Sequence, residues 1–256
     1  MYRQPPLLIV APLADDLDLA RLLWCDAARG NVTVNRAKFK NLDMVEVIVD
    51  AMPFLLTRLT EEETSGKLSA GTCNLPFGDQ PFSGGSAIGI APGANLACAS
   101  HVPETHRRLL LLGRSIGQGL EATAAAWMPA RTLGSFAWFV DTVDQYLADD
   151  RFPYPLHFAV SQVSSDQFLT RGLRYFTGQE IRLTIPPDYG LAAISERMEE
   201  IIAEVIAHGR IDGPSRSECP ARGETLIYTP SESPERVDIL IRRDARHNIA
   251  AERQGC

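Results

Sequence analysis

A serine between two glycines is the pattern in this chain that most resembles a catalytic motif. The string Gly113-Arg114-Ser115-Ile116-Gly117 fits G-x-S-x-G, the nucleophile elbow in which a strand delivers a serine onto a tight turn ahead of a helix. Glycines relieve crowding at such a turn, and the N-terminus of the following helix helps to hold the oxyanion. The chemistry that this pattern would support is that of a serine hydrolase.

A serine hydrolase also needs an acid and then a histidine later in the chain. Asp141 or Asp166, followed by His208, stand in that order after Ser115. However, the run before the serine is only four leucines, and no HG-type oxyanion loop follows an early strand. We therefore favour one long helix in which Ser115 and its glycine neighbours are small residues that permit close packing. A hydrolase that uses Ser115, Asp166 and His208 is the alternative.

Two histidines and a glutamate form a candidate metal cluster. His101, Glu104 and His106 make an H-x-x-E-x-H pattern, and zinc accepts such ligands when they converge. Pro103 disturbs the helical geometry, and the five-residue spacing places the two imidazoles on different faces. We predict a helix start with an exposed histidine and no metal site. No cofactor is predicted either, because Ser83-Gly84-Gly85-Ser86 lacks the lysine of a phosphate loop and the spacing of a dinucleotide fingerprint.

Charged residues alternate along residues 169–185, a segment that is typical of a bent or broken pair of strands. If no bulge intervenes, the period of two places Arg174, Glu180 and Arg182 on one face and Arg171 on the other. Ion pairing across the strands is the ordinary explanation, and a floor for an anionic ligand is the functional one. These three residues are the predicted binding residues.

The charge and composition disfavour several classes of partner. The chain carries 32 acidic and 25 basic residues, and its net charge of −7 repels nucleic acid and anionic lipid. Nowhere do about 18 apolar residues run uninterrupted, so no membrane-spanning segment is predicted. The five cysteines are scattered, unlike a disulfide framework, which indicates the reducing environment of the cytoplasm. The expected partner is a protein or a small molecule, with no nucleic acid and no membrane.

Hydrophobic periodicity indicates the elements that must position these residues. In the first half it predicts a strand at 7–12, a helix over 17–27, and a hairpin of strands at 31–39 and 44–49. Residues 60–93 shift in composition to Gly, Ser, Thr and Pro, which predicts a long loop, lid or linker.

The second half repeats this mixture of helices and strands. The predicted helices cover 103–126, 136–147 and 194–205. The predicted strands cover 127–133, 156–163, 169–185, 225–229 and 236–241, the last two as a closing hairpin. The apolar sides of these segments predict a core of Val45, Val47, Val49, Leu111, Phe139, Ile201, Ile202 and Val205.

The stretch from His106 to Ile185 also resembles a known family. An alanine-rich helix runs into Ala126-Trp127-Met128-Pro129-Ala130, Phe136 follows, and then comes Thr170-Arg171-Gly172-Leu173-Arg174-Tyr175-Phe176-Thr177-Gly178-Gln179-Glu180-Ile181. Together with the earlier strand ending at Ala51-Met52-Pro53, these segments are similar to a bacterial family, domain of unknown function 4261. The resemblance implies an α+β fold and carries over no catalytic residue.

The combined expectation is an α+β fold with mixed or antiparallel sheets packed by helices, and its two ends hint at two similar α/β layers. The domain prediction is a single domain over residues 1–256, or two subdomains at about 1–59 and 94–243 joined by the loop 60–93. Because no nucleophile, metal set or cofactor fingerprint is convincing, the expected role is non-enzymatic. It is protein interaction or small-ligand binding, with the Ser115 hydrolase as the alternative.

Overall fold

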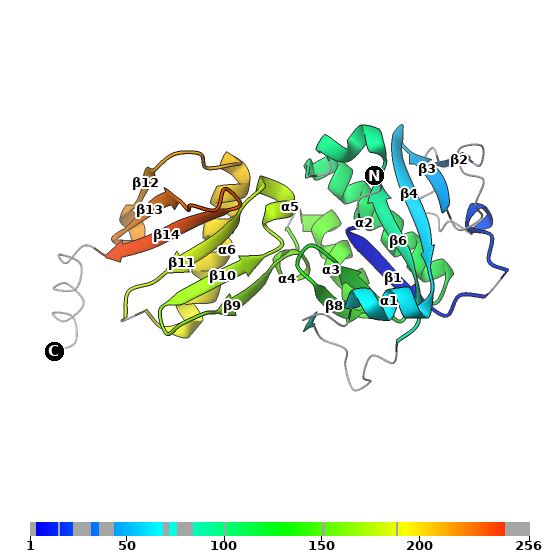
Figure 1. Ribbon diagram of the computed structural model, residues 1–256, viewed down its shortest axis with the longest axis horizontal. Coiled ribbons are helices and arrows are strands. Elements are labelled where there is room, and N and C mark those ends of the chain that lie inside the picture. Colours follow the sequence, from blue (N-terminus) through cyan, green and yellow to red (C-terminus); the bar gives the residue numbers. More distant parts are fainter. Residues whose placement is uncertain are drawn as a thin grey trace. The chain divides into compact units, whose positions relative to one another are not determined.

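The computed structural model describes residues 4–14, 16–22, 32–35, 44–68, 72–75, 84–99, 101–149, 152–187 and 189–243. The chain divides into two compact units, unit 1 (Met1–Ala159) and unit 2 (Val160–Cys256). Each unit holds one sheet packed by helices (Figure 1), so the predicted α+β class with antiparallel or mixed sheets is confirmed. The division falls at Ala159, whereas the expected linker 60–93 supplies a helix and two strands to unit 1.

Unit 1 is built on an eight-stranded sheet in the order β2-β3-β4-β6-β1-β7-β8-β5. Neighbouring strands are antiparallel except β5 and β8, which are parallel. The predicted hairpin at 31–39 and 44–49 is confirmed as β2 and β3, although its turn lies outside the described residues. The strands are β1 (Leu7–Ala11), β2 (Val32–Asn35), β3 (Met44–Val49), β4 (Met52–Leu59), β5 (Cys73–Asn74), β6 (Ser86–Pro92), β7 (Ala124–Trp127) and β8 (Thr132–Ser135).

The helical elements of unit 1 only partly follow the prediction. A 3-10 turn, η1 (Leu19–Arg21), lies within the expected helix 17–27, whose later part falls outside the described residues. The predicted helix 136–147 is confirmed as α3 (Phe136–Asp149). The others are α1 (Glu61–Leu68), η3 (Ala94–Ala99), α2 (Pro103–Gly119) and α4 (Tyr154–His157).

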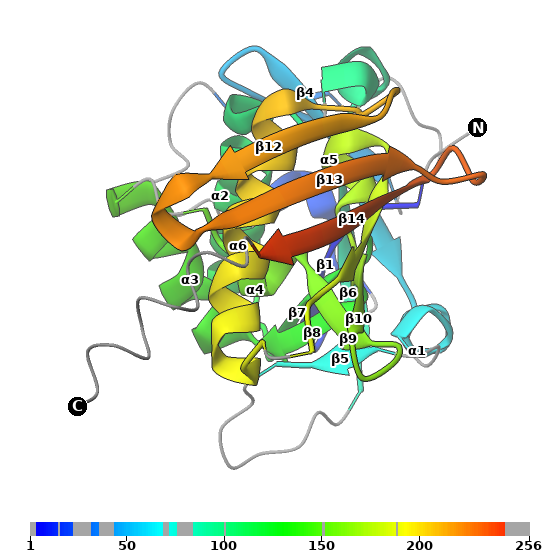
Figure 2. The same ribbon diagram turned by 90° about the vertical axis from the view of Figure 1, so that its left-hand side faces the viewer.

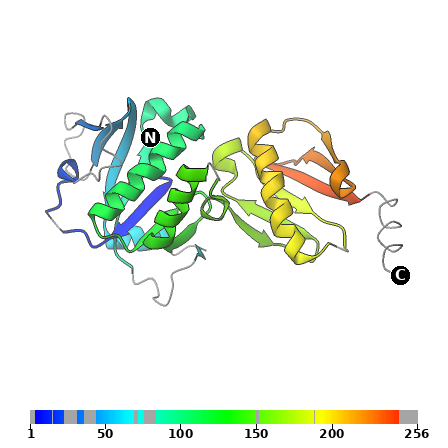
Figure 3. The same cartoon turned by 180° about the vertical axis from the view of Figure 1, so that it is seen from behind.

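Strand β1 lies in the middle of the sheet and is buried along its whole length. Leu8 and Val10 belong to an apolar cluster that includes Leu68 of α1. Leu7 and Ile9 point to the opposite face, where they approach Gly113 of α2. The helices coloured green in Figure 3, α2 and α3, cover that face. A strand covered on both faces is apolar at every position, which explains the continuous sequence LLIVA.

Two glycines bring α2 into close contact with its neighbours. A Cβ at Gly113 would lie 2.5 Å from a methyl of Leu7, and a Cβ at Gly117 would overlap the ring of Phe136 in α3. The close packing expected for this helix is therefore confirmed. The predicted core residue Leu111 is wrong, because it is only half-buried while Leu110 and Leu112 on either side are buried.

The substitution Gly117→Ala should lower the free energy of unfolding by about 1–3 kcal/mol, because the added methyl overpacks the contact with Phe136. The matched control is Gly66→Ala within α1, where a Cβ would meet no described atom within 4 Å. That control should raise stability by about 0.5–1 kcal/mol, because alanine favours helix more than glycine does. All three tryptophans lie in unit 1, so tryptophan fluorescence during denaturant unfolding reports both changes. Equal effects at the two sites would contradict the packing described for α2.

The predicted helix 103–126 ends early, at Gly119. The chain then forms the hairpin of β7 and β8, so the strand expected at 127–133 is wrong. Ala124 to Trp127 pair with β1 on one side and with β8 on the other. Pairing on both sides fixes these four residues as a strand, and this tertiary context overrides the helical preference of alanine.

Unit 2 contains a six-stranded sheet in the order β12-β13-β14-β11-β10-β9. Strands β11 and β14 are parallel, whereas β10–β11, β12–β13 and β13–β14 are antiparallel. The strand pair expected at 169–185 and the closing hairpin are thus confirmed. The strands are β9 (Ala159–Gln162), β10 (Gln167–Arg171), β11 (Glu180–Thr184), β12 (Ser215–Cys219), β13 (Glu224–Pro230) and β14 (Arg236–Arg243).

Helix α6 (Leu191–His208) covers one face of this sheet, and Figure 2 shows it behind β13 and β14. Its buried stripe is the predicted one, Ile194, Met198, Ile201, Ile202 and Val205. Gly209, at φ +78°, ends the helix as expected. A short helix, α5 (Arg174–Thr177), and a 3-10 turn, η4 (Pro220–Arg222), complete the unit. The sheets of units 1 and 2 differ in strand order, so the two units are not copies of one layer.

Candidate functional site

Ser115 lies inside helix α2 and is 1% exposed. Leu109 to Leu112, the strand of the hydrolase alternative, belong to the same helix, so the predicted elbow is wrong and the helical interpretation is confirmed. The other two members of that triad lie in unit 2. Asp166 accepts a hydrogen bond from the Ser164 hydroxyl in a turn, and His208 is the last residue of α6.

The candidate metal cluster is split by the fold. His101 is exposed, Glu104 pairs with Arg108 at 3.0 Å, and His106 is buried in α2. No group of three or more His, Cys, Asp or Glu side chains suited to a metal ion occurs in the described part of the chain.

His106 instead contacts a second buried histidine, His157 of α4, through the Nε2 atoms of both rings. The His157 ring stacks on Trp127 with centroids 4.7 Å apart, and Phe152 stacks on His106. Burial lowers the pKa of His106 to about 3, and burial and the charge of His106 lower the pKa of His157. Both rings are therefore neutral, and the N–H of one ring donates a hydrogen bond to the bare nitrogen of the other. Sequence reasoning missed this pair because the two histidines are 51 positions apart in the chain.

The predicted binding residue Glu180 is occupied by the backbone of its own unit. Its carboxylate accepts hydrogen bonds from the N–H groups of Gly172, Leu173 and Arg174 and from the Thr170 hydroxyl. Burial nevertheless raises the pKa of Glu180. The side chain thus holds the start of α5 in place.

The two predicted binding arginines pair with carboxylates of the same sheet. Arg182 makes two hydrogen bonds to its register partner Asp238, at 2.8 and 2.7 Å. Arg174, which lies in α5 and not on a strand as expected, pairs with Glu235. The ordinary explanation, ion pairing across strands, therefore accounts for Arg182. The charge of Arg174 is likewise neutralised, by Glu235.

A buried ion pair joins α6 to β13. Arg197 Nε lies 3.0 Å from Glu224, and the two side chains are 5% and 2% exposed. The Tyr189 hydroxyl donates to the other oxygen of Glu224, and Glu200 also accepts from Arg197. Because these partners satisfy both buried charges, this network positions α6 on the sheet.

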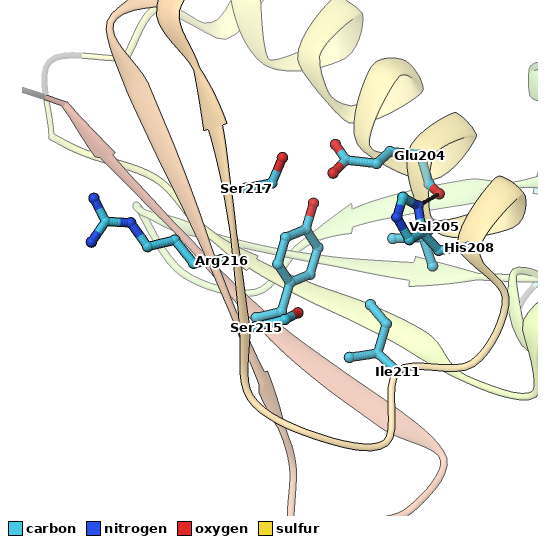
Figure 4. A pocket seen from close by; sticks show the side chains of 8 residues that line it. Glu204, Val205, His208, Ile211, Ser215, Arg216 and Ser217 are labelled. Carbon is cyan, nitrogen blue, oxygen red and sulfur yellow. Dashed lines mark hydrogen bonds between the residues drawn. The ribbon is translucent and has the colours of Figure 1, made fainter.

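A cavity of unit 2 lies between the end of α6 and the hairpin of β12 and β13. Its volume is about 240 Å³. Glu204 and His208, one helical turn apart, face Ser215 and Ser217, which share one side of β12 (Figure 4). Arg216 points to the other side of that strand and pairs with Glu218 at 3.0 Å. Val205, Ile211 and Tyr228 supply the apolar part of the lining.

The hydroxyl of Tyr228 is the unusual group in this cavity. Tyr228 is 4% exposed, and its hydroxyl is buried beside the Glu204 carboxylate, toward which it donates. No described residue donates to its oxygen. Burial, then the negative charge of Glu204 and the hydrogen bond to it, raise the pKa of Tyr228. A buried oxygen that lacks a donor can accept one from a ligand.

The neighbouring carboxylate is also available for a ligand. Glu204 is half-buried and forms no ion pair within the described ranges, whereas the nearby Glu200 and Glu224 are both paired with arginine. His208 places its Nδ1 3.1 Å from the Glu204 carbonyl oxygen, which orients the ring at the cavity mouth. The site thus offers a carboxylate, a phenol and two serine hydroxyls above an apolar floor.

Among these lining residues, sequence reasoning named His208 as a candidate catalytic residue and Val205 only as a core residue. Glu204 and His208 are four residues apart on a predicted helix, which places them on one face, but their partners come from strands at 215–219 and 224–230. The strand at 215–219 is exposed and polar, so no hydrophobic pattern predicted it.

Comparisons with protein-family models, curated proteins and solved structures found no match to the chain. The resemblance to domain of unknown function 4261 therefore stays a prediction. Within the described residues, no helix is both long enough and apolar enough to cross a membrane.

Proposed function

We propose that this chain is a non-enzymatic binding protein, and that the cavity of unit 2 takes a ligand carrying a primary ammonium group. The observation that carries the proposal is the buried Tyr228 hydroxyl beside the Glu204 carboxylate, where no described residue donates to the hydroxyl oxygen or forms an ion pair with the carboxylate. A ligand that carries N–H donors supplies what both oxygens lack.

The lining selects an ammonium group over other cations. Lysine-type ammonium has three donors and no acceptor. Acceptor oxygens come from three elements around the cavity: Glu204 from α6, Tyr228 from β13 and Ser217 from β12. Val205 and Ile211 give an apolar surface for the methylene groups that carry the ammonium.

Binding can be tested with Nα-acetyl-lysine methylamide, and with the norleucine analogue as the uncharged control. Amide resonances of residues 204–217 and 228 should shift on titration with the lysine compound and stay fixed with the norleucine compound. Glu204→Gln should weaken binding at least tenfold, which corresponds to about 1.4 kcal/mol, because it removes the negative charge. Glu199→Gln is the matched control, because it makes the same change on α6 outside the cavity lining.

Tyr228→Phe separates a binding role from a structural one. The substitution should weaken binding of the lysine compound, yet change the stability of the unliganded protein by no more than about 1 kcal/mol, because it removes only the hydroxyl beside Glu204. Unchanged binding in Tyr228→Phe, or equal shifts with both compounds, would contradict the proposal.

A further inference from the structure

Strand β12, beside this cavity, is at an edge of the six-stranded sheet. On one side it pairs with β13 over five positions, from Ser215 opposite Tyr228 to Cys219 opposite Glu224. No strand that the structure describes pairs with its other side. An edge strand of this kind presents backbone N–H and C=O groups to another extended chain.

The two sides of β12 differ in what they present. Ser215 and Ser217 line the cavity beneath α6, whereas Arg216 points away and pairs with Glu218 (Figure 4). A chain added beside β12 would continue the pleat about 4.8 Å further out. Every second side chain of the added strand would then lie on the α6 side, at the mouth of the cavity.

The size and charge of the cavity specify the occupant. Its volume of about 240 Å³ is below the roughly 300–1,000 Å³ of pockets for drug-sized molecules, but it is suited to one side chain. The unpaired Glu204 carboxylate and the net charge of −7 favour a basic partner. The Tyr228 hydroxyl, buried beside Glu204 and with no described donor to its oxygen, is placed to accept from a donor that enters there.

From these three features we infer that the ligand is an extended peptide segment that pairs with β12 and inserts a lysine side chain between Glu204 and Tyr228. The inference rests on the ammonium site proposed above. Backbone pairing with β12 supplies affinity, and the lysine pocket supplies selectivity.

The test compares four probes on the full chain: a capped pentapeptide Thr-Val-Lys-Val-Thr, its norleucine version, its version with N-methylated backbone, and Nα-acetyl-lysine methylamide. The pentapeptide should bind at least tenfold more tightly than the single-residue compound. Norleucine replacement and backbone N-methylation should each weaken binding of the pentapeptide at least tenfold. Hydrogen exchange at the amides of residues 215–219 should slow in the complex.

The possible outcomes separate this inference from the proposed function. If the single-residue compound binds as tightly as the pentapeptide, strand pairing is refuted and the ammonium site stands. If no probe binds, both are refuted. Protection at β9 instead of β12, or protein dimerisation through β12 in sedimentation, would also overturn the peptide assignment.

Discussion

Acidification from pH 7 to pH 5 should remove about 3–4 kcal/mol from the free energy of unfolding of unit 1, because it contains the buried pair His106 and His157. Burial lowers both folded-state pKa values, that of His106 to about 3, whereas an unfolded histidine titrates near 6.5. The stabilisation is therefore complete above pH 6.5. It is lost as pH falls from there toward 3, since only the unfolded chain takes up the protons.

Denaturant unfolding followed by tryptophan fluorescence at several pH values measures this loss in unit 1. The double variant His106→Leu with His157→Phe should show a nearly flat dependence between pH 7 and 5, whatever its stability at pH 7. His208→Gln is the matched control, because that histidine is exposed and lies in unit 2. A wild-type stability that does not change across this interval would show that the pair is not buried as described.

Glu224→Gln should destabilise unit 2 by about 2–4 kcal/mol, because the buried Arg197 guanidinium then keeps only the partly exposed Glu200 as a carboxylate partner. Combining it with Arg197→Met should recover most of that loss, since a buried ion pair is replaced by neutral groups. Hydrogen exchange of peptides from α6 and β13 reports unit 2 separately from the tryptophans of unit 1.

Glu235→Gln provides the comparison at an exposed pair. The side chains of Arg174 and Glu235 are 55% and 51% exposed, so this variant should lose less than about 1 kcal/mol. Similar losses in Glu224→Gln and Glu235→Gln would mean that burial does not set the strength of the α6 attachment.

The elements predicted correctly from sequence are those whose pattern repeats over many residues. The apolar stripe of α6 extends over twelve positions, from Ile194 to Val205, and β3 and β13–β14 are rich in β-branched residues. Such patterns record which side of an element faces a core, and that is a local property.

The sequence-based predictions are wrong where the structure of a segment depends on a partner far away in the sequence. The alanines at 124–126 favour a helix locally, yet pairing with β1 and β8 makes them a strand. The triad Ser115, Asp166 and His208 was assembled from chain order alone, and its serine lies within a helix. The groups that stand out chemically, His106 with His157 and Glu204 with Tyr228, each come from elements that sequence spacing cannot pair.

The sheet order of unit 1 also constrains when the unit can fold during synthesis. Strand β1 precedes every other described strand, but its two neighbours are β6, at 86–92, and β7, at 124–127. At roughly 5–20 residues per second, a ribosome needs roughly 6–25 seconds to proceed from Val10 to Trp127. During that time the fully apolar segment LLIVA has emerged without the strands that will flank it. The wide sequence separation between β1 and its two neighbours gives unit 1 long-range strand pairings, and such pairings slow folding.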